Sequence, residues 1–102
     1  MEKKLKVVWT DNAIQDLAII KEYIAEDSVA RSEKWVTELL DAGEGLSTFA
    51  NRGRVVPEFN QDNLRELLID NYRLVYRLSP KLVEIIAVFE SHRQLRKDDV
   101  KE

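Results

Sequence analysis

The spacing of apolar residues changes at Gly53, and this change limits the fold more than any other feature of the sequence. Before Gly53 the apolar residues recur at intervals of three and four, which is typical of helices that bury one face. After Gly53 they form the short runs that are typical of β-strands. Because the chain has only 102 residues, we assign all of it, 1–102, to one domain.

Two helices are predicted in the first half, joined as a hairpin. Thr10 and Ser28 are residue types that commonly cap helices, and the periodic pattern behind them extends over roughly 11–26 and 29–50. The predicted buried stripe of the first helix consists of Ile14, Leu17, Ala18, Ile20, Tyr23 and Ile24.

Three glycines lie in or after the second helix. Gly43 and Gly45 weaken it, and each either allows a close approach of the first helix or marks a kink. Gly53 is expected to end this region with a positive φ angle.

One strand is predicted before the helices and a small antiparallel meander after them. The expected strands cover 5–9, 54–57, 64–69, 72–78 and 82–89. Pro57 confines its short strand to an edge or an end of the sheet. Asp70-Asn71 tolerates positive φ angles, so it suits a tight hairpin.

The predicted fold class is therefore α+β: an N-terminal strand, a helical hairpin and an antiparallel meander packed on the helices. In the strand at 72–78, Arg73, Val75 and Arg77 alternate with apolar residues, which predicts a face half exposed to water. The tail at 96–102, with its acidic pair Asp98-Asp99, is expected to be frayed and solvated.

The composition excludes several kinds of site. Because the chain has no cysteine, it has no disulfide, iron–sulfur cluster or thiolate zinc site. It has one histidine and no cluster of Asp or Glu at ligand spacing, so we expect no metal and no other cofactor.

No segment suits a membrane or a secretion pathway. The longest apolar run, at 85–89, is too short to span a bilayer, and the first ten residues lack the apolar stretch of a signal peptide. We therefore expect a cytoplasmic protein without a membrane partner. The net charge of −3 argues against binding of nucleic acid by the whole surface, and we expect no sequence-specific DNA binding by this chain alone.

The charge is divided unevenly along the chain. Residues 1–51 have 6 basic and 10 acidic side chains, whereas residues 52–97 have 9 basic, mostly arginine, and 6 acidic ones. Arginine forms bidentate contacts with phosphate and carboxylate groups. The second half therefore has either an ordinary solvated surface or a basic face for an anionic partner.

The order of these elements and four strings of residues resemble the RelE/ParE superfamily, the toxins of bacterial type II toxin–antitoxin (plasmid stabilisation) systems. The strings are WTDNAIQDL at 9–17, GRVVPEF at 53–59, LRELLIDNYRLVYRL at 64–78 and VEIIAVFESHRQL at 83–95. The resemblance implies a toxin that inhibits bacterial growth and is neutralised by direct binding of a partly disordered antitoxin encoded beside it. It leaves the target open, because RelE-like members cleave mRNA on the ribosome without a metal, whereas ParE-like members inhibit DNA gyrase.

A nuclease would need catalytic groups, and the resemblance supplies candidates. Metal-free RNA cleavage requires a base for the 2′-OH proton, an acid for the leaving oxygen and cations at the phosphate. By resemblance, Glu58 is the candidate base, Arg73 contacts the scissile phosphate, and Arg93 and His92 lie where the family has a further cation and an acid.

The same residues also have structural interpretations. Glu58 and His92 have the positions of ordinary solvated groups, and Arg73 is able to pair across the sheet with Glu66 or Glu84. Tyr72 and Tyr76 are interpreted as aromatic residues that pack in the sheet rather than as catalytic phenols.

Two departures from the RelE-like pattern favour a ParE-like protein. No tyrosine follows Tyr76 and the last aromatic residue is Phe89, whereas RelE-like nucleases usually end in a tyrosine that contacts the substrate. A chain with a net charge of −3 also lacks the counterion release that drives binding to rRNA. The ParE-like segment His-Gly/Ser-x-Arg is matched at Ser91 and Arg93 but has Glu90 in place of the histidine.

We therefore predict a ParE-like toxin that binds DNA gyrase. The alternatives are a ribosome-dependent mRNA endonuclease and a non-toxic homologue that only binds the antitoxin. The residues predicted to contact the target or the antitoxin are Arg65, Arg73, Arg77, Arg93, Arg96 and Lys97. An acidic, amphipathic antitoxin segment is expected to approach Arg65, Arg73 or Arg77 as a helix in a groove or as an added strand.

Overall fold

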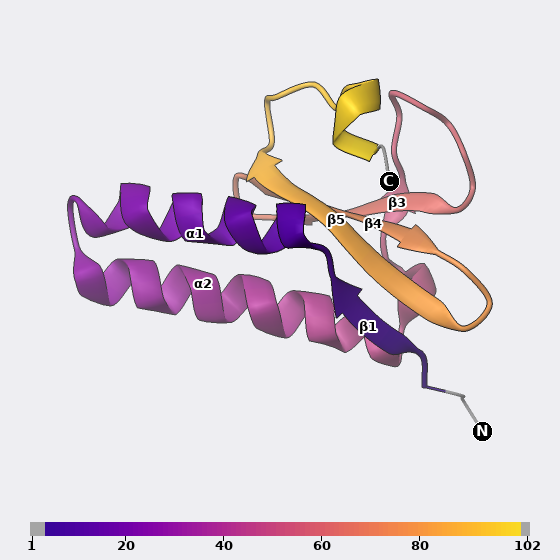
Figure 1. Cartoon of the computed structure of the whole chain (residues 1–102), viewed down its shortest axis with the longest axis horizontal. Helices are drawn as coiled ribbons and strands as arrows, with labels where there is room; N and C mark the ends of the chain where they lie inside the picture. The colour runs from indigo at the N-terminus through magenta and orange to yellow at the C-terminus, as the bar shows by residue number, and fades with distance from the viewer. Residues whose placement is uncertain (1–3, 101–102) are drawn as a thin grey trace.

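The computed structural model describes residues 4–100 and has the predicted order of N-terminal strand, helical hairpin and meander (Figure 1). The elements are β1 (Lys6–Trp9), α1 (Asp11–Ala25), α2 (Val29–Glu44), the 3₁₀ turns Gly45–Ser47 and Ala50–Arg52, β2 (Arg54–Val55), β3 (Leu64–Ile69), β4 (Tyr72–Leu78), β5 (Leu82–Glu90) and the 3₁₀ turn Lys97–Val100.

The five strands form one mixed sheet in the order β1-β5-β4-β3-β2. The strands β2 to β5 pair as antiparallel neighbours, as the predicted meander requires. β1 instead pairs in parallel with β5, with Lys6 opposite Leu82 and Trp9 opposite Ile85. The sequence does not predict this pairing, because a strand so far from its partner has no local signal for it. Since the pairing stops at Ile85, the end of β5 has no strand beside it on that side.

The helices begin at the predicted caps. Thr10 Oγ1 and Ser28 Oγ each accept a hydrogen bond of 3.1 Å from the backbone N–H three residues later. The end of α1 agrees with its prediction within a residue, but α2 ends at Glu44 and not at residue 50. The helix stops because Gly45, a residue of low helix propensity, follows it, and two 3₁₀ turns carry the chain on to β2.

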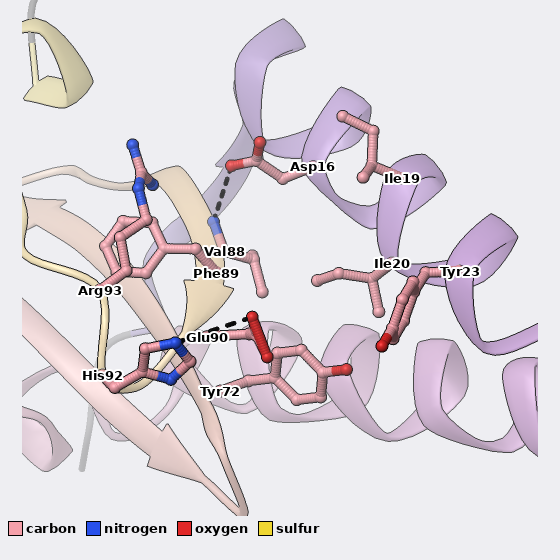
Figure 2. Close-up of a pocket in the computed structure, with 10 residues that line it drawn as sticks. All are labelled: Asp16, Ile19, Ile20, Tyr23, Tyr72, Val88, Phe89, Glu90, His92 and Arg93. Atoms are coloured by element: carbon pink, nitrogen blue, oxygen red, sulfur yellow. Dashed lines mark hydrogen bonds and ion pairs between the residues drawn. The ribbon is translucent and has the colours of Figure 1, made fainter.

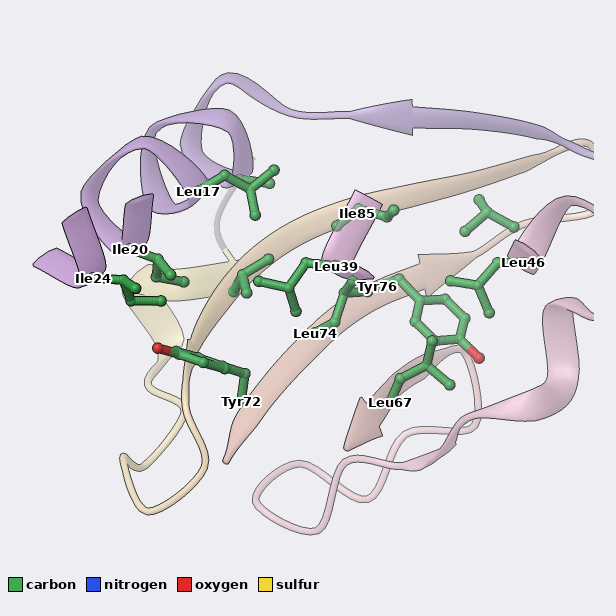
Figure 3. Close-up of a cluster of buried hydrophobic side chains, with 13 residues drawn as sticks. Leu17, Ile20, Ile24, Leu39, Leu46, Leu67, Tyr72, Leu74, Tyr76 and Ile85 are labelled. Carbon is green, nitrogen blue, oxygen red and sulfur yellow. The ribbon is translucent and has the colours of Figure 1, made fainter. Parts of the chain in front are cut away.

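The helical hairpin covers one face of the sheet, where most of the large buried side chains lie (Figure 3). This core cluster includes Leu17, Ile20 and Ile24 of α1, Leu39 of α2, Tyr72, Leu74 and Tyr76 of β4, and Ile85 of β5. The predicted buried stripe is wrong at three positions: Ala18 is exposed, and Ile14 and Tyr23 are 53% and 70% exposed. The reason is that the helix faces the sheet with the narrower set 13, 17, 20 and 24, and these three residues lie outside it.

Two of the glycines are required for close packing, but not in the way the sequence suggests. A Cβ at Gly43 would overlap the Trp9 ring and lie 2.7 Å from Ile85 Cδ1, so the close approach is to the sheet and not to α1. Gly53 has φ −76°, so the predicted positive φ is wrong. Its Cβ would lie 2.6 Å from both Tyr76 Oη and Glu66 O, and this crowding explains the glycine.

The second face of the sheet is buried as well, which corrects the prediction that it is half exposed. Arg73 and Val75 are 5% and 0% exposed. A second cluster fills this face, made of Val56, Leu64, Val75, Ile86, Ala87, Phe89 and Leu95, with Phe59 and Val100 packed against it. The loop after β2 and the residues after β5 supply the cover that the strand pattern alone does not reveal.

Two further expectations concern the turns and the chain end. Asp70 adopts φ 55°, as expected for the hairpin between β3 and β4. Of the tail predicted at 96–102, residues 97–100 form a 3₁₀ turn, and 101–102 lie outside the described part of the chain. Within residues 4–100, none of the helices combines the length and the hydropathy that a membrane crossing requires.

Candidate functional site

A buried ion network joins β2, β3, β4 and the loop after β2. Arg73 Nε donates to Glu66 Oε1 at 2.6 Å, and its Nη1 and Nη2 donate to the two carboxylate oxygens of Glu58, each at 2.8 Å. Arg54 Nε donates to the second oxygen of Glu66 at 2.6 Å. The side chain of Glu66 is fully buried between the two arginines. Two cations and two anions therefore neutralise one another, with Glu66, Arg73 and Glu58 largely buried and the Arg54 side chain 57% exposed at the edge of the sheet.

The hydrogen bonds in this network control the ionisation of Glu58. The side-chain hydrogen bonds from Arg73 are the main reason that the pKa of Glu58 is lowered to about 2, against the opposing effect of burial. The backbone N–H of Leu95 donates to the same carboxylate at 2.8 Å and lowers the pKa further. Pairing with Glu58 in turn raises the pKa of Arg73. The pair is thus fully charged at neutral pH.

Residues 91–100, called the C-terminal segment below, run across the second face of the sheet. Arg73 Nη1 donates to Arg93 O at 2.8 Å, while Glu58 accepts from Leu95 N. The Leu95 side chain is buried in the second cluster. Further along, Arg77 Nη2 donates to Val100 O at 2.8 Å. The segment is thus held by side chains of β4 and of the loop after β2.

The two other residues of the predicted nuclease site lie at the surface of this segment. The Arg93 guanidinium lies over the Phe89 ring (Figure 2), 4.4 Å from its centroid. It donates to Asp99 Oδ1 at 2.8 Å. The His92 side chain is 78% exposed, and its Nε2 lies 3.9 Å from Glu90 Oε1. The structure therefore brings Glu58, Arg73 and the backbone of Arg93 together and leaves the His92 ring outside their network.

The remaining predicted contact residues are distributed around this region. Arg65 donates to the carboxylate and the carbonyl of Asp62 and to Gly53 O. Arg77 lies 3.5 Å from Glu84, and Arg96 and Lys97 are exposed on the C-terminal segment.

Two members of the site escape a sequence-based search. Arg54 joins the network because β2 places it opposite Glu66, but a two-residue strand carries too little pattern to predict its register. Asp99, expected to be solvated, instead accepts hydrogen bonds from the Arg93 side chain and from Arg96 N. Pairing of Arg73 with Glu66, one of the two partners considered, is confirmed.

A groove of about 590 Å³ lies between α1 and the end of β5 (Figure 2). It is lined by Asp16, Ile19, Ile20, Tyr23, Tyr72, Val88, Phe89, Glu90, His92 and Arg93. Asp16 Oδ2 accepts from Val88 N at 2.9 Å, in the place where β1 no longer pairs, and burial raises the pKa of Asp16. The signal for this groove is the pair Ile19 and Tyr23, one helical turn apart and outside the core stripe.

Nothing in the described chain suggests a metal centre. Among residues 4–100, no three side chains of His, Cys, Asp or Glu are grouped as a metal ion would require. The site is therefore made of ion pairs, backbone anchors and exposed cations.

Comparisons with known sequences relate this chain to toxins. The family model described as ParE toxin of type II toxin-antitoxin system, parDE, matches residues 7–95. A curated relative, Toxin RelE2 of Caulobacter vibrioides, is 30% identical over 89 residues, which are 86% of this chain and 97% of that protein.

Two solved structures have a similar fold. The chromosomal ParDE TA system from P. aeruginosa has a chain with a TM-score of 0.72 and 21% identity, covering 86% of this chain and 97% of its own. The toxin–antitoxin complex RelBE2 from Mycobacterium tuberculosis has one with a TM-score of 0.63 and 20% identity, covering 88% and 97%.

Proposed function

Because the chain belongs to the ParE toxin family of type II toxin–antitoxin systems, we propose that it inhibits growth by binding a protein target, DNA gyrase, and that a cognate antitoxin neutralises it by direct binding. The protein then needs a contact surface and no catalytic group. The C-terminal segment, with Arg93, Arg96 and Lys97, is the proposed contact surface for gyrase.

The state of Arg73 carries this proposal. All three nitrogens of its guanidinium are engaged by the carboxylates of Glu58 and Glu66 and by Arg93 O. These hydrogen bonds use four of its five N–H donors, and Nη2 also lies 2.6 Å from Glu66 Oε1, so a scissile phosphate would have to displace these acceptors. Arg73, which the nuclease alternative needs at the phosphate, is therefore engaged in contacts within the protein.

The state of Glu58 supports the same conclusion. An efficient general base has a pKa near the working pH, whereas ion pairing lowers the pKa of Glu58 to about 2. A carboxylate so strongly stabilised in its ionised form has little tendency to take a proton from a 2′-OH. The net charge of −3 also gives the chain little general attraction to RNA.

The experiment compares the two targets with the same purified chain. We expect it to inhibit DNA supercoiling by purified gyrase, while induction in cells leaves mRNA intact. Arg96→Ala and Lys97→Ala should each weaken the inhibition several-fold, whereas Lys81→Ala, which removes a cation from the turn at the other end of β5, should not. Codon-phased mRNA breaks with normal supercoiling would instead establish the nuclease alternative.

The antitoxin is proposed to carry an acidic, amphipathic segment that approaches Arg65, Arg73 or Arg77. Because Arg73 is buried in its own network, we expect the contact at Arg65 or Arg77, whose side chains are 18% and 24% exposed. A structure of the complex in which no antitoxin atom comes within hydrogen-bonding distance of either arginine would contradict this expectation.

A further inference from the structure

Glu58 and Arg73 hold the C-terminal segment at two backbone groups on either side of Gln94. Arg73 Nη1 donates to Arg93 O and Glu58 Oε2 accepts from Leu95 N, both at 2.8 Å. The two side chains are also bonded to each other, so a donor and an acceptor in fixed relative positions meet a C=O and an N–H of one short stretch. In a β-sheet, a neighbouring strand supplies a donor and an acceptor to a backbone in the same way. Here the side chains of Arg73 and Glu58 supply them.

These hydrogen bonds are stronger than ordinary surface contacts. The Arg73 and Glu58 side chains are 6% and 14% exposed, so water competes little for their charges. Hydrogen bonds to ionised groups are roughly twice as strong as neutral ones, and a low local dielectric strengthens them. Leu95 is buried and adds apolar contacts within the second cluster.

The residues on the outer side of the same stretch are the cations proposed to contact the target. Arg96 and Lys97 are exposed, while the Arg96 backbone N–H is fixed by Asp99 at 2.8 Å. Asp99 also binds the Arg93 side chain, which lies over Phe89 (Figure 2). The segment therefore presents its cations from an ordered backbone, although it contains no long helix or strand.

Order of this kind increases affinity. A mobile cationic tail loses conformational entropy when it binds, whereas a segment that is already held in its bound geometry does not. The buried Glu58–Arg73 pair then contributes to binding by keeping the C-terminal segment in one geometry.

We propose that Glu58 and Arg73 are positioning residues, which clamp the backbone at Arg93 and Leu95 so that Arg96 and Lys97 form one fixed surface for the target protein. This inference rests on the proposed function, because it takes gyrase as the target. It gives the two residues a role without any bond making or breaking.

The test uses matched carboxylate-to-amide variants of the full chain. Glu58→Gln removes the charge that holds Leu95 N and Arg73, whereas Asp62→Asn removes the charge of an exposed ion pair with Arg65 that does not touch the C-terminal segment. Both variants raise the net charge by one, so bulk electrostatics is matched. Leu95→Ala releases the segment from its apolar side and leaves the Glu58–Arg73 pair intact.

Two readouts are measured for each variant. Hydrogen exchange of the Leu95 amide reports whether the clamp is closed, and the concentration that halves gyrase supercoiling reports target binding. In Glu58→Gln we expect the Leu95 amide to exchange about tenfold faster and the inhibitory concentration to rise about tenfold, which matches the loss of one charge-assisted hydrogen bond. Leu95→Ala should raise the inhibitory concentration similarly, and Asp62→Asn should change neither quantity.

The outcomes separate the clamp from the proposed function. If Glu58→Gln exchanges faster at Leu95 but inhibits gyrase as well as the unmodified chain does, the positioning role is wrong. If Glu58→Gln weakens inhibition while Leu95→Ala does not, Glu58 contacts the target directly and the proposal is again wrong. If the unmodified chain does not inhibit gyrase, the proposed function fails, and unchanged exchange at Leu95 in Glu58→Gln would show that the clamp is absent as well.

Discussion

Replacing Tyr76 by phenylalanine removes one hydroxyl group that connects the sheet to the turns after α2. The Tyr76 ring is completely buried in the core cluster (Figure 3). Its hydroxyl donates to Ala50 O at 2.7 Å and accepts from Gly53 N at 2.9 Å. The variant keeps the ring and its packing, so the change isolates these two hydrogen bonds.

The expected loss follows from the groups left without a partner. An unsatisfied buried donor costs about 1–3 kcal/mol, which applies to the Gly53 N–H. Ala50 O is only partly buried, and we expect about 1 kcal/mol for it. The free energy of unfolding should therefore fall by about 2–4 kcal/mol, equivalent to a decrease in Tm of about 10–20 °C for a domain of this size.

The assay is urea-induced unfolding followed by far-ultraviolet circular dichroism, with Tyr72→Phe as the control. Tyr72 packs in the same cluster, edge-on to Trp35, but its hydroxyl makes no hydrogen bond within the described chain. We expect the control to change the stability by less than about 0.5 kcal/mol. Equal losses in both variants, or a loss below about 1 kcal/mol in Tyr76→Phe, would show that these two hydrogen bonds do not stabilise the fold as expected.

Three other predictions follow from packing and ionisation. Gly43→Ala should destabilise the fold by about 1–3 kcal/mol, because the new Cβ meets the Trp9 ring and Ile85. Gly45→Ala should be tolerated, because the nearest atom to its new Cβ is 4.0 Å away. Thermal unfolding of the two variants measures the difference. The ion pair lowers the pKa of Glu58 from 4.5 to about 2, so the pair stabilises the fold above pH 4.5 and this stabilisation is lost as the pH falls toward 2. Measurements of Tm at decreasing pH should show the decline, and Glu58→Gln should flatten it. Burial raises the pKa of the two core tyrosines, so the fold should lose stability as the pH rises above about 10, measured by circular dichroism during an alkaline titration.

The elements that sequence patterns predict best are those whose signals act over a few residues. The caps at Thr10 and Ser28 and the turn at Asp70 each depend on one side chain and its immediate backbone. The extent of β3 and β4 follows from apolar runs bounded by polar turns. The order of strand, hairpin and meander then follows from the order of these signals.

What the patterns do not contain is the identity of the segment that covers each surface. Val75 and Arg73 alternate with core residues and resemble a wet strand face, yet Leu95 and Val56, distant in sequence, bury that face. Gly53 has a similar explanation: only glycine fits at this position because Tyr76, on the distant strand β4, packs against it.

The sequence predicts only part of the candidate site, because Arg54 and Asp99 join it through contacts that no local pattern reveals. Glu58 and Arg73 meet as the family resemblance suggests. Whether an arginine is available to a substrate depends on how many acceptors surround it. For Arg73 these acceptors include Glu66 and Arg93 O, which are brought to it by tertiary structure, as is the register of β2 that adds Arg54 to the network.

The pairing of β1 with β5 brings the first and last strands of the chain together. Lys6 and Leu82 lie opposite each other and are 76 positions apart (82 − 6), so the sheet closes only after nearly the whole chain has been translated. The helical hairpin lies within residues 11–44, but until β5 has been made its apolar face has only an incomplete sheet to pack against. A message broken before the codons of β5 therefore yields a chain without the strand that joins both ends of the fold and without the C-terminal segment. We expect such fragments to be degraded without harm, so that premature termination does not release an active toxin.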